Sequence, residues 1–289
     1  MNPLYAKHYA DSAHFVDAEI ICNEQIASET YLLRCAAPQI TSTIVPGQFV
    51  MLRMSGFNDP LIGRALAMHD KVIDAEGDEL LEVVYLVKGK LTTRLQYMLP
   101  GQRVSLWGPL GNGFGTDSCN TLIMVAGGVG ITPFLALARE ALGLASYGSL
   151  RPSGYANRAT LLYGVRSSTY VAAESKFRAA GVDVRVCTDD GSRLPKARVP
   201  ELLESYLDEL ASGVNVRIAT CGPEIMIQRT AELAMSRGIA CELSLETPMA
   251  CGIGVCFSCV AKIRQADGDW DYKRTCVEGP VFTADQVIW

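Results

Sequence analysis

The chain has 289 residues, and its 49% hydrophobic and 20% charged residues are typical of a globular protein with about two domains. Its net charge of −5, without a long basic run, argues against nucleic acid as a partner. Residues 1–19 lack the apolar stretch of a secretory signal, so we expect a cytoplasmic protein whose scattered cysteines are reduced thiols.

Residues 1–14 are expected to be a polar leader, and residues 15–115 a first, all-β domain. Short segments rich in β-branched and aromatic residues follow one another there without intervening helices. These segments are DAEIICNEQ, TYLLRCAAP, QFVMLRM, LLEVVYLV and RVSLWG. Strands spaced this closely predict a β-sandwich or a barrel.

One arginine of this domain is a candidate ligand. The stretch GRALA places Arg64 at a strand end beside small residues, which suits a phosphate-binding residue and equally an exposed surface arginine. Two of the three histidines, His8 and His14, lie in the leader, and His69 is expected to be a turn residue. The sequence therefore gives little support to a hydrolase built on a Ser-His-Asp triad or on His-bound zinc.

Residues 116–240 are expected to form a doubly wound α/β domain with a parallel sheet. Apolar strands alternate there with helical segments, beginning with TLIMVAG, PFLALAREALGLA and ATLLYGV. The uncharged run over residues 121–138 has the length of a membrane helix, but glycines and Pro133 interrupt it. We interpret this run as a strand, a turn and a helix, and expect no membrane span.

A glycine-rich turn, AGGVGITP, follows the first strand of this domain. At such a position small residues admit a dinucleotide pyrophosphate, and the N-terminus of the following helix favours its charge. Thr132 is the expected N-cap of that helix and Pro133 its first residue. The candidate NAD ligands in this turn are Gly127, Gly128, Gly130, Thr132 and Pro133. The motif departs from G-x-G-x-x-G, so a turn that only packs helix against sheet is the alternative.

A later strand of the same sheet ends in Cys221-Gly222-Pro223. The carboxyl ends of parallel strands face the ligand crevice of such folds, which makes these residues further NAD candidates. Cys221 either lines the nicotinamide site or is a buried core cysteine. The stretch Arg166-Ser167-Ser168 either meets a 2′-phosphate or is a solvated loop, so these residues leave both NAD and NADP open.

Residues 241–289 are expected to form a small, loop-rich domain that holds four clustered cysteines. Their spacing is Cys251-x4-Cys256-x2-Cys259, followed after sixteen residues by Cys276. Plant-type 2Fe–2S proteins use this spacing, in which each iron takes two thiolates. Intervening glycines suit a backbone that wraps around a cluster. Zinc is the alternative, although only one C-x2-C pair of the kind that zinc sites prefer is present.

In this order the three groups of motifs resemble the ferredoxin–NADP reductase superfamily. More narrowly, the chain is similar to the electron-transfer subunits of type B dihydroorotate dehydrogenase. The narrow resemblance rests on MACGIGVCFSC, residues 249–259, and CVEGPVF, residues 276–282, and the whole likeness covers residues 15–289. It implies a flavin-binding barrel, an NAD(P)-binding domain and a 2Fe–2S domain.

The resemblance also implies FAD ligands in the barrel. The family's R-P-x-S motif corresponds to residues 64–67, a Tyr-containing strand to residues 84–87, and a G-x-G-T turn to residues 89–92. The implied FAD contacts are Arg64, Ala65, Leu66, Ala67, Val84, Tyr85, Leu86, Leu91 and Thr92. Three of these residues depart from the family pattern, because Ala65 replaces proline, Ala67 replaces serine and Leu91 replaces glycine. Flavin affinity and potential are therefore not fixed by the resemblance.

The function implied is electron transfer between NAD(H), FAD and the 2Fe–2S cluster, to or from an FMN-containing catalytic subunit that oxidises dihydroorotate in pyrimidine biosynthesis. A heterotetramer with that subunit is the implied assembly. Val255 and Phe257 of the cysteine loop are either exposed contacts for the partner or packed inward. The alternatives are a reductase subunit of a ferredoxin oxidoreductase, hydrogenase or sulfur reductase, and a zinc-stabilised interaction protein without flavin.

Overall fold

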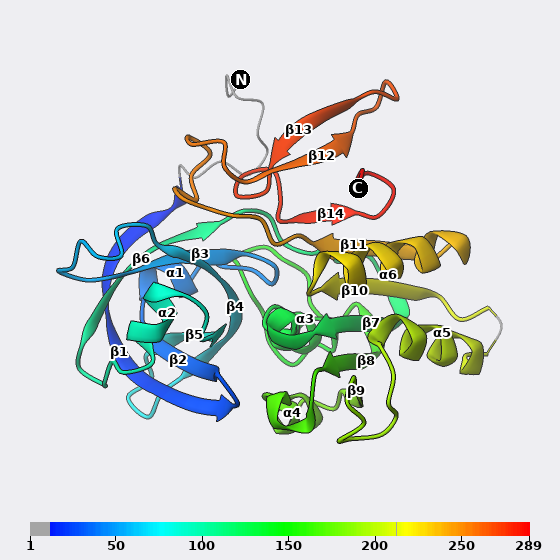
Figure 1. Ribbon diagram of the computed structural model, residues 1–289, viewed down its shortest axis with the longest axis horizontal. Coiled ribbons are helices and arrows are strands. Elements are labelled where there is room, and N and C mark those ends of the chain that lie inside the picture. The colour runs from blue at the N-terminus through cyan, green and yellow to red at the C-terminus, as the bar shows by residue number, and fades with distance from the viewer. Residues whose placement is uncertain (1–11, 212) are drawn as a thin grey trace.

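The computed structural model describes residues 12–211 and 213–289, and Figure 1 shows its parts in chain order. A β-barrel comes first, a sheet covered by helices comes second, and a small hairpin projects near the C-terminus. Residues 1–11 of the expected polar leader lie outside the described residues, and His14 already belongs to the first barrel strand.

The first domain is a closed, antiparallel barrel, which selects the barrel over the sandwich. In order around the barrel, its strands are β1 (His14–Ala27), β2 (Thr30–Ala36), β5 (Glu79–Leu86), β4 (Arg64–Ile73), β3 (Phe49–Met54) and β6 (Arg103–Leu110). Inward-facing side chains such as Leu33, Val50 and Tyr85 form one apolar core. Two short helices that the sequence pattern did not predict, α1 (Pro38–Thr41) and α2 (Lys90–Leu95), contribute to that core.

The second domain is a sheet in the order β14-β11-β10-β7-β8-β9, in which only β14 runs antiparallel to its neighbour. The strands are β7 (Cys119–Gly127), β8 (Ala156–Val165), β9 (Asp183–Thr188), β10 (Val216–Cys221), β11 (Ala240–Ser244) and β14 (Val281–Thr283). The helices are α3 (Phe134–Ala141), α4 (Glu174–Ala179), α5 (Val199–Glu209) and α6 (Glu224–Ser236). Successive residues of β7 face opposite sides: Met124 packs with α3 and α4, whereas Val125 packs with α5 and α6. The doubly wound architecture is confirmed.

The order of the strands reverses beside β7. Strands β8 and β9 extend the sheet on one side of β7, and the chain then crosses to the other side to form β10 and β11. Strands β7 and β10 are parallel neighbours, with Ala126 paired to Cys221 at their carboxyl ends. Open α/β sheets bind ligands in the crevice outside the strand ends at such a reversal. Both predicted NAD segments therefore follow the two strands that flank this crevice.

The uncharged run over residues 121–138 is divided between β7, the 3₁₀ turn η2 (Gly128–Ile131) and α3. This agrees with the interpretation as strand, turn and helix, although the 3₁₀ turn was not predicted. Among the described residues, no helix combines the length and the apolar character needed to traverse a bilayer.

The C-terminal segment shares the sheet of the second domain. Strand β11 pairs with β10, and β14 pairs with β11, so the sheet extends past the boundary expected at residue 240. The residues between these strands form the cysteine loop and the hairpin of β12 (Val260–Arg264) and β13 (Trp270–Arg274), which projects from the rest of the molecule in Figure 1. The hairpin was not predicted.

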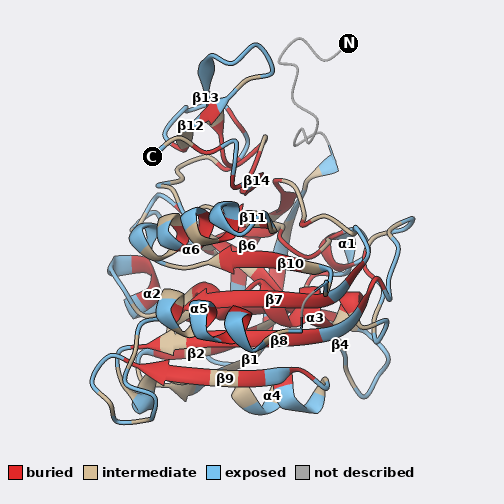
Figure 2. Ribbon diagram, turned by 90° about the vertical axis from the view of Figure 1, so that its right-hand side faces the viewer, coloured by how far each residue is buried: buried red, intermediate tan, exposed pale blue. Residues whose placement is uncertain are grey.

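Buried polar contacts join the barrel to the second domain along β4 and β5. His69 is a fully buried residue of β4 rather than the expected turn residue, and its Nδ1 lies 2.9 Å from the carbonyl oxygen of Thr132. The next residue, Asp70, accepts hydrogen bonds from Arg139 and Tyr147. Figure 2 shows the strands of the sheet almost wholly buried, while the helices expose one side. The two domains are thus held by specific bonds as well as by apolar packing.

Glu82 is a buried carboxylate at the same interface. It lies on β5, accepts a 2.8 Å hydrogen bond from Nε of Arg34 within the barrel, and forms an ion pair with Lys176 on α4 of the second domain. The carboxylate side chain is 0% exposed, whereas the two cations are 30% and 32% exposed. The positive charges of Arg34 and Lys176 are therefore balanced by a carboxylate that water does not reach.

We predict that Glu82→Gln lowers the free energy of unfolding by about 2 kcal/mol, because the amide cannot balance the charges of Arg34 and Lys176. The loss is smaller than for a wholly buried pair, since both cations keep contact with water. Denaturant unfolding of the holoprotein measures it. In the control Glu79→Gln, the partly exposed pair with Lys71 is lost at a cost below about 1 kcal/mol. Equal losses in the two variants would contradict the prediction.

Candidate functional site

The cysteine loop lies against the outer side of barrel strands β3 and β6. Cys259 and Cys276 are buried in a small apolar group, here called the bridging cluster, with Phe49, Met51, Leu110 and Val277. Ala65, Ala67, Trp107 and Met249 pack against this group. The loop therefore borrows its core from the barrel, as expected for a segment too small to build one alone.

Two glycines allow the loop to fit this surface. Gly252 has φ +73°, and a Cβ atom there would lie 2.5 Å from Cγ of Met51. Gly254 has φ +79°, and its Cβ atom would lie 2.6 Å from Cγ2 of Val277. Both positions therefore require glycine for conformation and for space. The expectation that glycines shape the cysteine loop is confirmed.

The four predicted cysteines come together as two pairs. Hydrogen bonds from Ser258 and Cys251 lower the pKa of Cys256 to about 6. A hydrogen bond with Cys276 lowers the pKa of Cys259 to about 6, and the same contact raises the pKa of Cys276. The pairs are thus 251 with 256 and 259 with 276.

This donor set fits a dinuclear cluster. Each iron of a 2Fe–2S centre takes two protein thiolates, which matches two cysteine pairs. The backbone N–H of Ile253 donates to Sγ of Cys251 at 3.4 Å, a contact that favours a thiolate. The two pairs and the hydrogen bond to Cys251 therefore agree with the ligand set of such a cluster.

The arginine motif opens strand β4 beside the bridging cluster. Arg64 is exposed, and its guanidinium forms no ion pair with any described residue; its hydrogen bond, of 3.2 Å, goes to the carbonyl of Gly63. Ala65 and Ala67 face the group that contains Cys259 and Cys276. A free cation next to a cradle of small side chains suits a phosphate-bearing cofactor. The structure thus brings the predicted flavin motif next to the predicted cluster ligands.

Three other predicted FAD residues, Leu66, Tyr85 and Leu91, belong to the core of the barrel. The hydroxyl of Tyr85 donates to Oδ1 of Asn23 at 2.9 Å, and its ring stacks on Tyr31 at a centroid separation of 5.6 Å. Val84 and Thr92 are buried but do not belong to that core, and Leu86 is half-buried. Because successive residues of a strand face opposite sides, Val84 and Leu86 point away from the barrel interior, whereas the side chains of Tyr85 and Leu91 face it. The side chain of Leu91, which replaces a glycine of the family, therefore points away from a ligand.

The two predicted NAD segments touch each other. A Cβ atom on Gly130 would lie 2.2 Å from the carbonyl oxygen of Cys221, and one on Gly222 would lie 2.9 Å from the backbone nitrogen of Gly127. By contrast, Gly128 has φ +55° and open space around its missing side chain. Gly130 and Gly222 therefore allow the carboxyl ends of β7 and β10 to approach each other, and the backbone at Gly128 stays accessible.

Thr132 does not cap the helix as expected. It directly follows the 3₁₀ turn η2, and the N-cap position of α3 is Pro133. The Thr132 hydroxyl donates to the carbonyl of Val129 at 2.6 Å and lies 3.4 Å from the carbonyl of Val84 in the barrel. Because Thr132 is buried between the domains, its side chain positions the turn and does not face a ligand.

Cys221 ends β10 at the crevice and is half-buried. Burial raises the pKa of its thiol to about 12, so the thiol stays protonated at neutral pH. It is therefore suited to line a site and not to act as a base or nucleophile.

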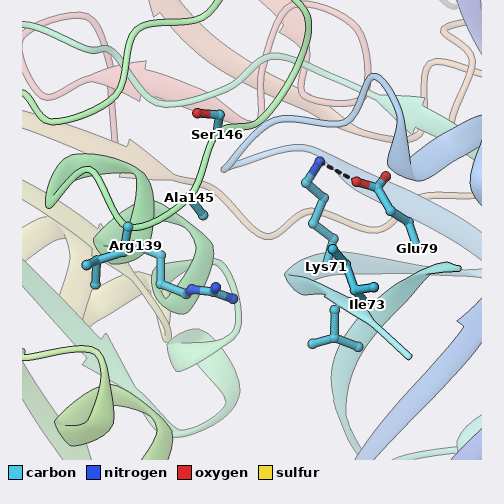
Figure 3. A pocket seen from close by; sticks show the side chains of 8 residues that line it. Lys71, Ile73, Glu79, Arg139, Ala145 and Ser146 are labelled. Atoms are coloured by element: carbon cyan, nitrogen blue, oxygen red, sulfur yellow. Dashed lines mark hydrogen bonds and ion pairs between the residues drawn. The ribbon is translucent and has the colours of Figure 1, made fainter. Parts of the chain in front are cut away.

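A separate pocket of about 480 Å³ lies between β4, β5 and the end of α3 (Figure 3). Lys71 is paired there with Glu79 at 3.0 Å, and Arg139, whose side chain also lines the pocket, is bonded to Asp70. Its lining contains none of the predicted site residues. Because its cations already have partners, we assign it no cofactor.

One residue that contacts the cysteine loop was not predicted from the sequence. Nε1 of Trp107, on β6, donates to the carbonyl oxygen of Cys251 at 2.9 Å. This tryptophan follows the alternation of an ordinary strand, and its partner is 144 residues away in the chain. No local signal distinguishes it from a core residue.

Comparison with known proteins supports each part of this arrangement. Residues 17–114 match the family described as oxidoreductase FAD-binding domain, and residues 124–232 match the oxidoreductase NAD-binding domain. Residues 246–288 match the iron-sulfur cluster binding domain of dihydroorotate dehydrogenase B. The order of domains is the one expected from the motifs.

Among solved structures, that of an NADH-dependent reduced ferredoxin–NADP oxidoreductase has a TM-score of 0.78 and 26% identity, covering 95% of this chain and 90% of its own. A ferredoxin NADP⁺ reductase from Neisseria gonorrhoeae, with a TM-score of 0.60, 19% identity and coverage of 78% and 92%, shares the fold.

Curated relatives match nearly the whole chain. The dihydroorotate dehydrogenase B (NAD(+)) electron transfer subunit of Desulforamulus reducens is 34% identical over 274 residues, which are 94% of this chain and 98% of the relative. The subunit of the same name from Geobacillus thermodenitrificans is 32% identical over 273 residues, with coverage of 93% and 96%. The chain therefore belongs to the family of dihydroorotate dehydrogenase B electron-transfer subunits.

Proposed function

We propose that this protein relays electrons between NAD(H), FAD and a 2Fe–2S cluster, and exchanges them with an FMN-containing catalytic subunit that oxidises dihydroorotate. The observation that carries the proposal is the bridging cluster, in which the flavin motif residues Ala65 and Ala67 pack with Cys259 and Cys276. Flavin exchanges a hydride with nicotinamide and single electrons with a cluster, which is the chemistry this adjacency serves. Membership of the family and its relatives' names support the choice of partner.

The roles of individual residues are part of the proposal. Arg64 binds the FAD phosphates, and residues 65–67 line the flavin together with the backbone of residues 84–86 and 91–92. The turn around Gly128 and the residues Cys221, Gly222 and Pro223 hold the dinucleotide at the sheet crevice. Cys251, Cys256, Cys259 and Cys276 ligate the cluster. No general acid or base is assigned, since the chain's task is to hold donor and acceptor in position.

We propose NAD(H) as the dinucleotide. Arg166 follows β8 and stacks on Tyr170, with its guanidinium carbon 5.4 Å from the ring centroid. The backbone N–H of Asp190 donates to the carbonyl of Arg166 at 3.1 Å, which brings exposed Asp189 and Asp190 beside it. Carboxylates at this position favour a ribose hydroxyl over a 2′-phosphate.

The partner is proposed to dock on the cysteine loop. Val255 is 70% exposed and Phe257 is 60% exposed, and the Phe257 ring rests on Arg274 with the guanidinium carbon 5.1 Å from its centroid. Exposed apolar side chains directly beside the predicted ligand Cys256 suit a contact through which electrons leave. A cytoplasmic location is proposed from the ten cysteines, which form no disulfide with one another.

A reductase subunit of another redox complex is the second candidate. The solved NADH-dependent reduced ferredoxin–NADP oxidoreductase shares the fold over 95% of this chain at 26% identity. Ala67 also lacks the hydroxyl that the family pattern places near the flavin. Copurification with an FMN protein that oxidises dihydroorotate favours the first function, and reduction of ferredoxin without that partner favours the second.

Anaerobic purification tests the relay directly. We expect about two irons and one FAD per chain, together with bleaching of the flavin band on addition of NADH. Visible spectroscopy, iron analysis and flavin extraction measure these quantities. Colourless protein that binds neither iron nor FAD after anaerobic reconstitution would refute the proposed function.

We predict that Cys276→Ala abolishes the 2Fe–2S cluster and leaves FAD bound and reducible by NADH, because one iron loses a ligand that alanine cannot replace while the dinucleotide crevice is untouched. Iron content and stopped-flow absorbance measure the two effects separately. Cys22→Ala is the control, since this half-buried barrel cysteine lies outside the loop, and this variant should retain full iron. Full iron in both variants would exclude Cys276 as a ligand.

We predict that the double variant Val255→Thr with Phe257→Asn slows electron transfer to the catalytic partner by at least about tenfold, because the apolar contact is removed from the docking surface. Asparagine is chosen because residue 257 has φ +55°, which asparagine tolerates. Flavin reduction by NADH should be unchanged. The control Leu194→Ser alters an exposed leucine on the loop after β9. Transfer at the unaltered rate in the double variant would place the partner elsewhere.

A further inference from the structure

Trp107 contacts both the cysteine loop, at Cys251, and the residue that precedes the arginine motif, Gly63. It lies on β6, where it pairs with Phe15 of β1 on one side and with Met51 of β3 on the other. Its indole is half-buried at the edge of the bridging cluster, and the ring of Phe15 stacks on it at a centroid separation of 6.2 Å. The indole therefore lies on the outer surface of the barrel, where the cysteine loop and the start of β4 meet.

On the side of the proposed 2Fe–2S ligands, Trp107 contacts the backbone of Cys251. Its Nε1–H donates to the carbonyl oxygen of Cys251 at 2.9 Å. The following residue, Gly252, lies so close to Met51 that no side chain fits between them. The peptide that leaves Cys251 is thus fixed at both ends by neighbouring residues of the barrel, and its orientation sets the position of the Cys251 sulfur.

On the flavin side, the same indole supports the start of the arginine motif. A Cβ atom on Gly63 would lie 2.8 Å from Cη2 of Trp107 and 2.8 Å from the carbonyl oxygen of Leu52. The benzene ring of the indole therefore fills the space in which a side chain at residue 63 would stand. Arg64 follows directly, and its guanidinium donates to the Gly63 carbonyl.

We propose that Trp107 is a positioning residue that sets the separation and orientation of the cluster relative to the flavin. The proposal rests on the proposed function, and it assigns the two ring systems of the indole different tasks. The pyrrole N–H orients Cys251, and the benzene ring orients the strand that carries Arg64. In the transfer concerned, one electron leaves the reduced flavin and reduces the oxidised cluster, and no covalent bond forms or breaks. Small displacements of donor and acceptor slow such steps strongly.

Two substitutions isolate the task of the N–H. Trp107→Phe removes the N–H and also the far end of the benzene ring, because a phenyl ring does not reach the position of Cη2. In Trp107→His, the imidazole overlays the five-membered ring of the indole and places an N–H at the position of Nε1, while the benzene ring is lost. Phe15→Leu is the matched control, because it removes the stacking partner of the indole without touching either bridging contact. All variants are prepared anaerobically as full chains with their cofactors.

The first readout does not depend on turnover. Each protein is reduced with dithionite, and the electron paramagnetic resonance spectrum of the cluster is recorded along with iron and FAD content. We expect a shifted spectrum or lower iron in Trp107→Phe, and a spectrum close to the unaltered one in Trp107→His and Phe15→Leu, because hydrogen bonds near the sulfurs tune the cluster.

The second readout is single-turnover mixing with NADH, in which flavin bleaching and cluster reduction are resolved as separate phases. We expect the flavin phases of Trp107→Phe and Trp107→His to agree within about twofold, because both variants lose the far end of the benzene ring. The cluster phase of Trp107→Phe should be slower than that of Trp107→His by about tenfold or more. Loss of the cluster from Trp107→Phe but not from Trp107→His also supports the role of the N–H.

Trp107→Phe with an unaltered spectrum and an unaltered cluster phase would overturn the proposal, as would equal loss of iron from both Trp107 variants. If NADH bleaches no flavin even in the unaltered protein, the proposed function fails instead. The dithionite spectra still report on Trp107 in that case, so the two failures are distinguishable.

Discussion

The packing of the cysteine loop on the outer surface of the barrel is the contact that places the flavin motif beside the four cysteines. The buried apolar side chains of residues 246–279 are only Cys259, Ile263, Cys276 and Val277. The loop packs chiefly on Phe49, Met51 and Leu110 of the barrel. Gly252 marks the point of closest approach. Because Ala65 and Ala67 pack against the same group, the contact that folds the loop also brings the flavin motif next to the cysteines.

This shared packing gives a physical account of two departures from the family pattern. A serine hydroxyl or a rigid proline ring is the family's choice at positions that are occupied here by Ala67 and Ala65. Both alanines are half-buried against apolar neighbours, where a hydroxyl without a partner would be unfavourable. Alanine fits that packing because its side chain has no polar atom that needs a hydrogen-bond partner. Any hydrogen bond that tunes the flavin must then come from another residue.

The sequence was most informative where function imposes a local pattern. The cysteine spacing identified all four members of the two thiol pairs, and the strand–helix alternation predicted the parallel sheet. Local patterns did not predict the structure where the decisive partner of a residue is distant in the chain. The local sequence around Thr132 is typical of an N-cap. In the structure its hydroxyl contacts the carbonyl of Val84 and its own carbonyl contacts His69, both in the barrel. Strand β14 returns to the sheet of the second domain after the hairpin, which no period in the sequence reveals.

The contact between His69 and Thr132 shows how such distant partners align the two nucleotide sites. His69 and Arg64 lie on the same strand, and Thr132 directly follows the dinucleotide turn, so one hydrogen bond connects the flavin motif to the NAD motif. Nε2 of His69 is buried without a hydrogen-bond partner among the described residues, which assigns the ring hydrogen to Nδ1 as donor to the Thr132 carbonyl.

Burial lowers the pKa of His69, because a second N–H and a charge would both be enclosed without a partner. The ring is therefore neutral at neutral pH, and the bond does not change as the pH moves around that value. The neighbouring pair of Asp70 with Arg139 supplies attraction between the domains, but a charged pair of this kind tolerates several geometries. The neutral, buried bond of His69 is directional, and it is better suited to fix the register between β4 and the turn on which hydride transfer depends.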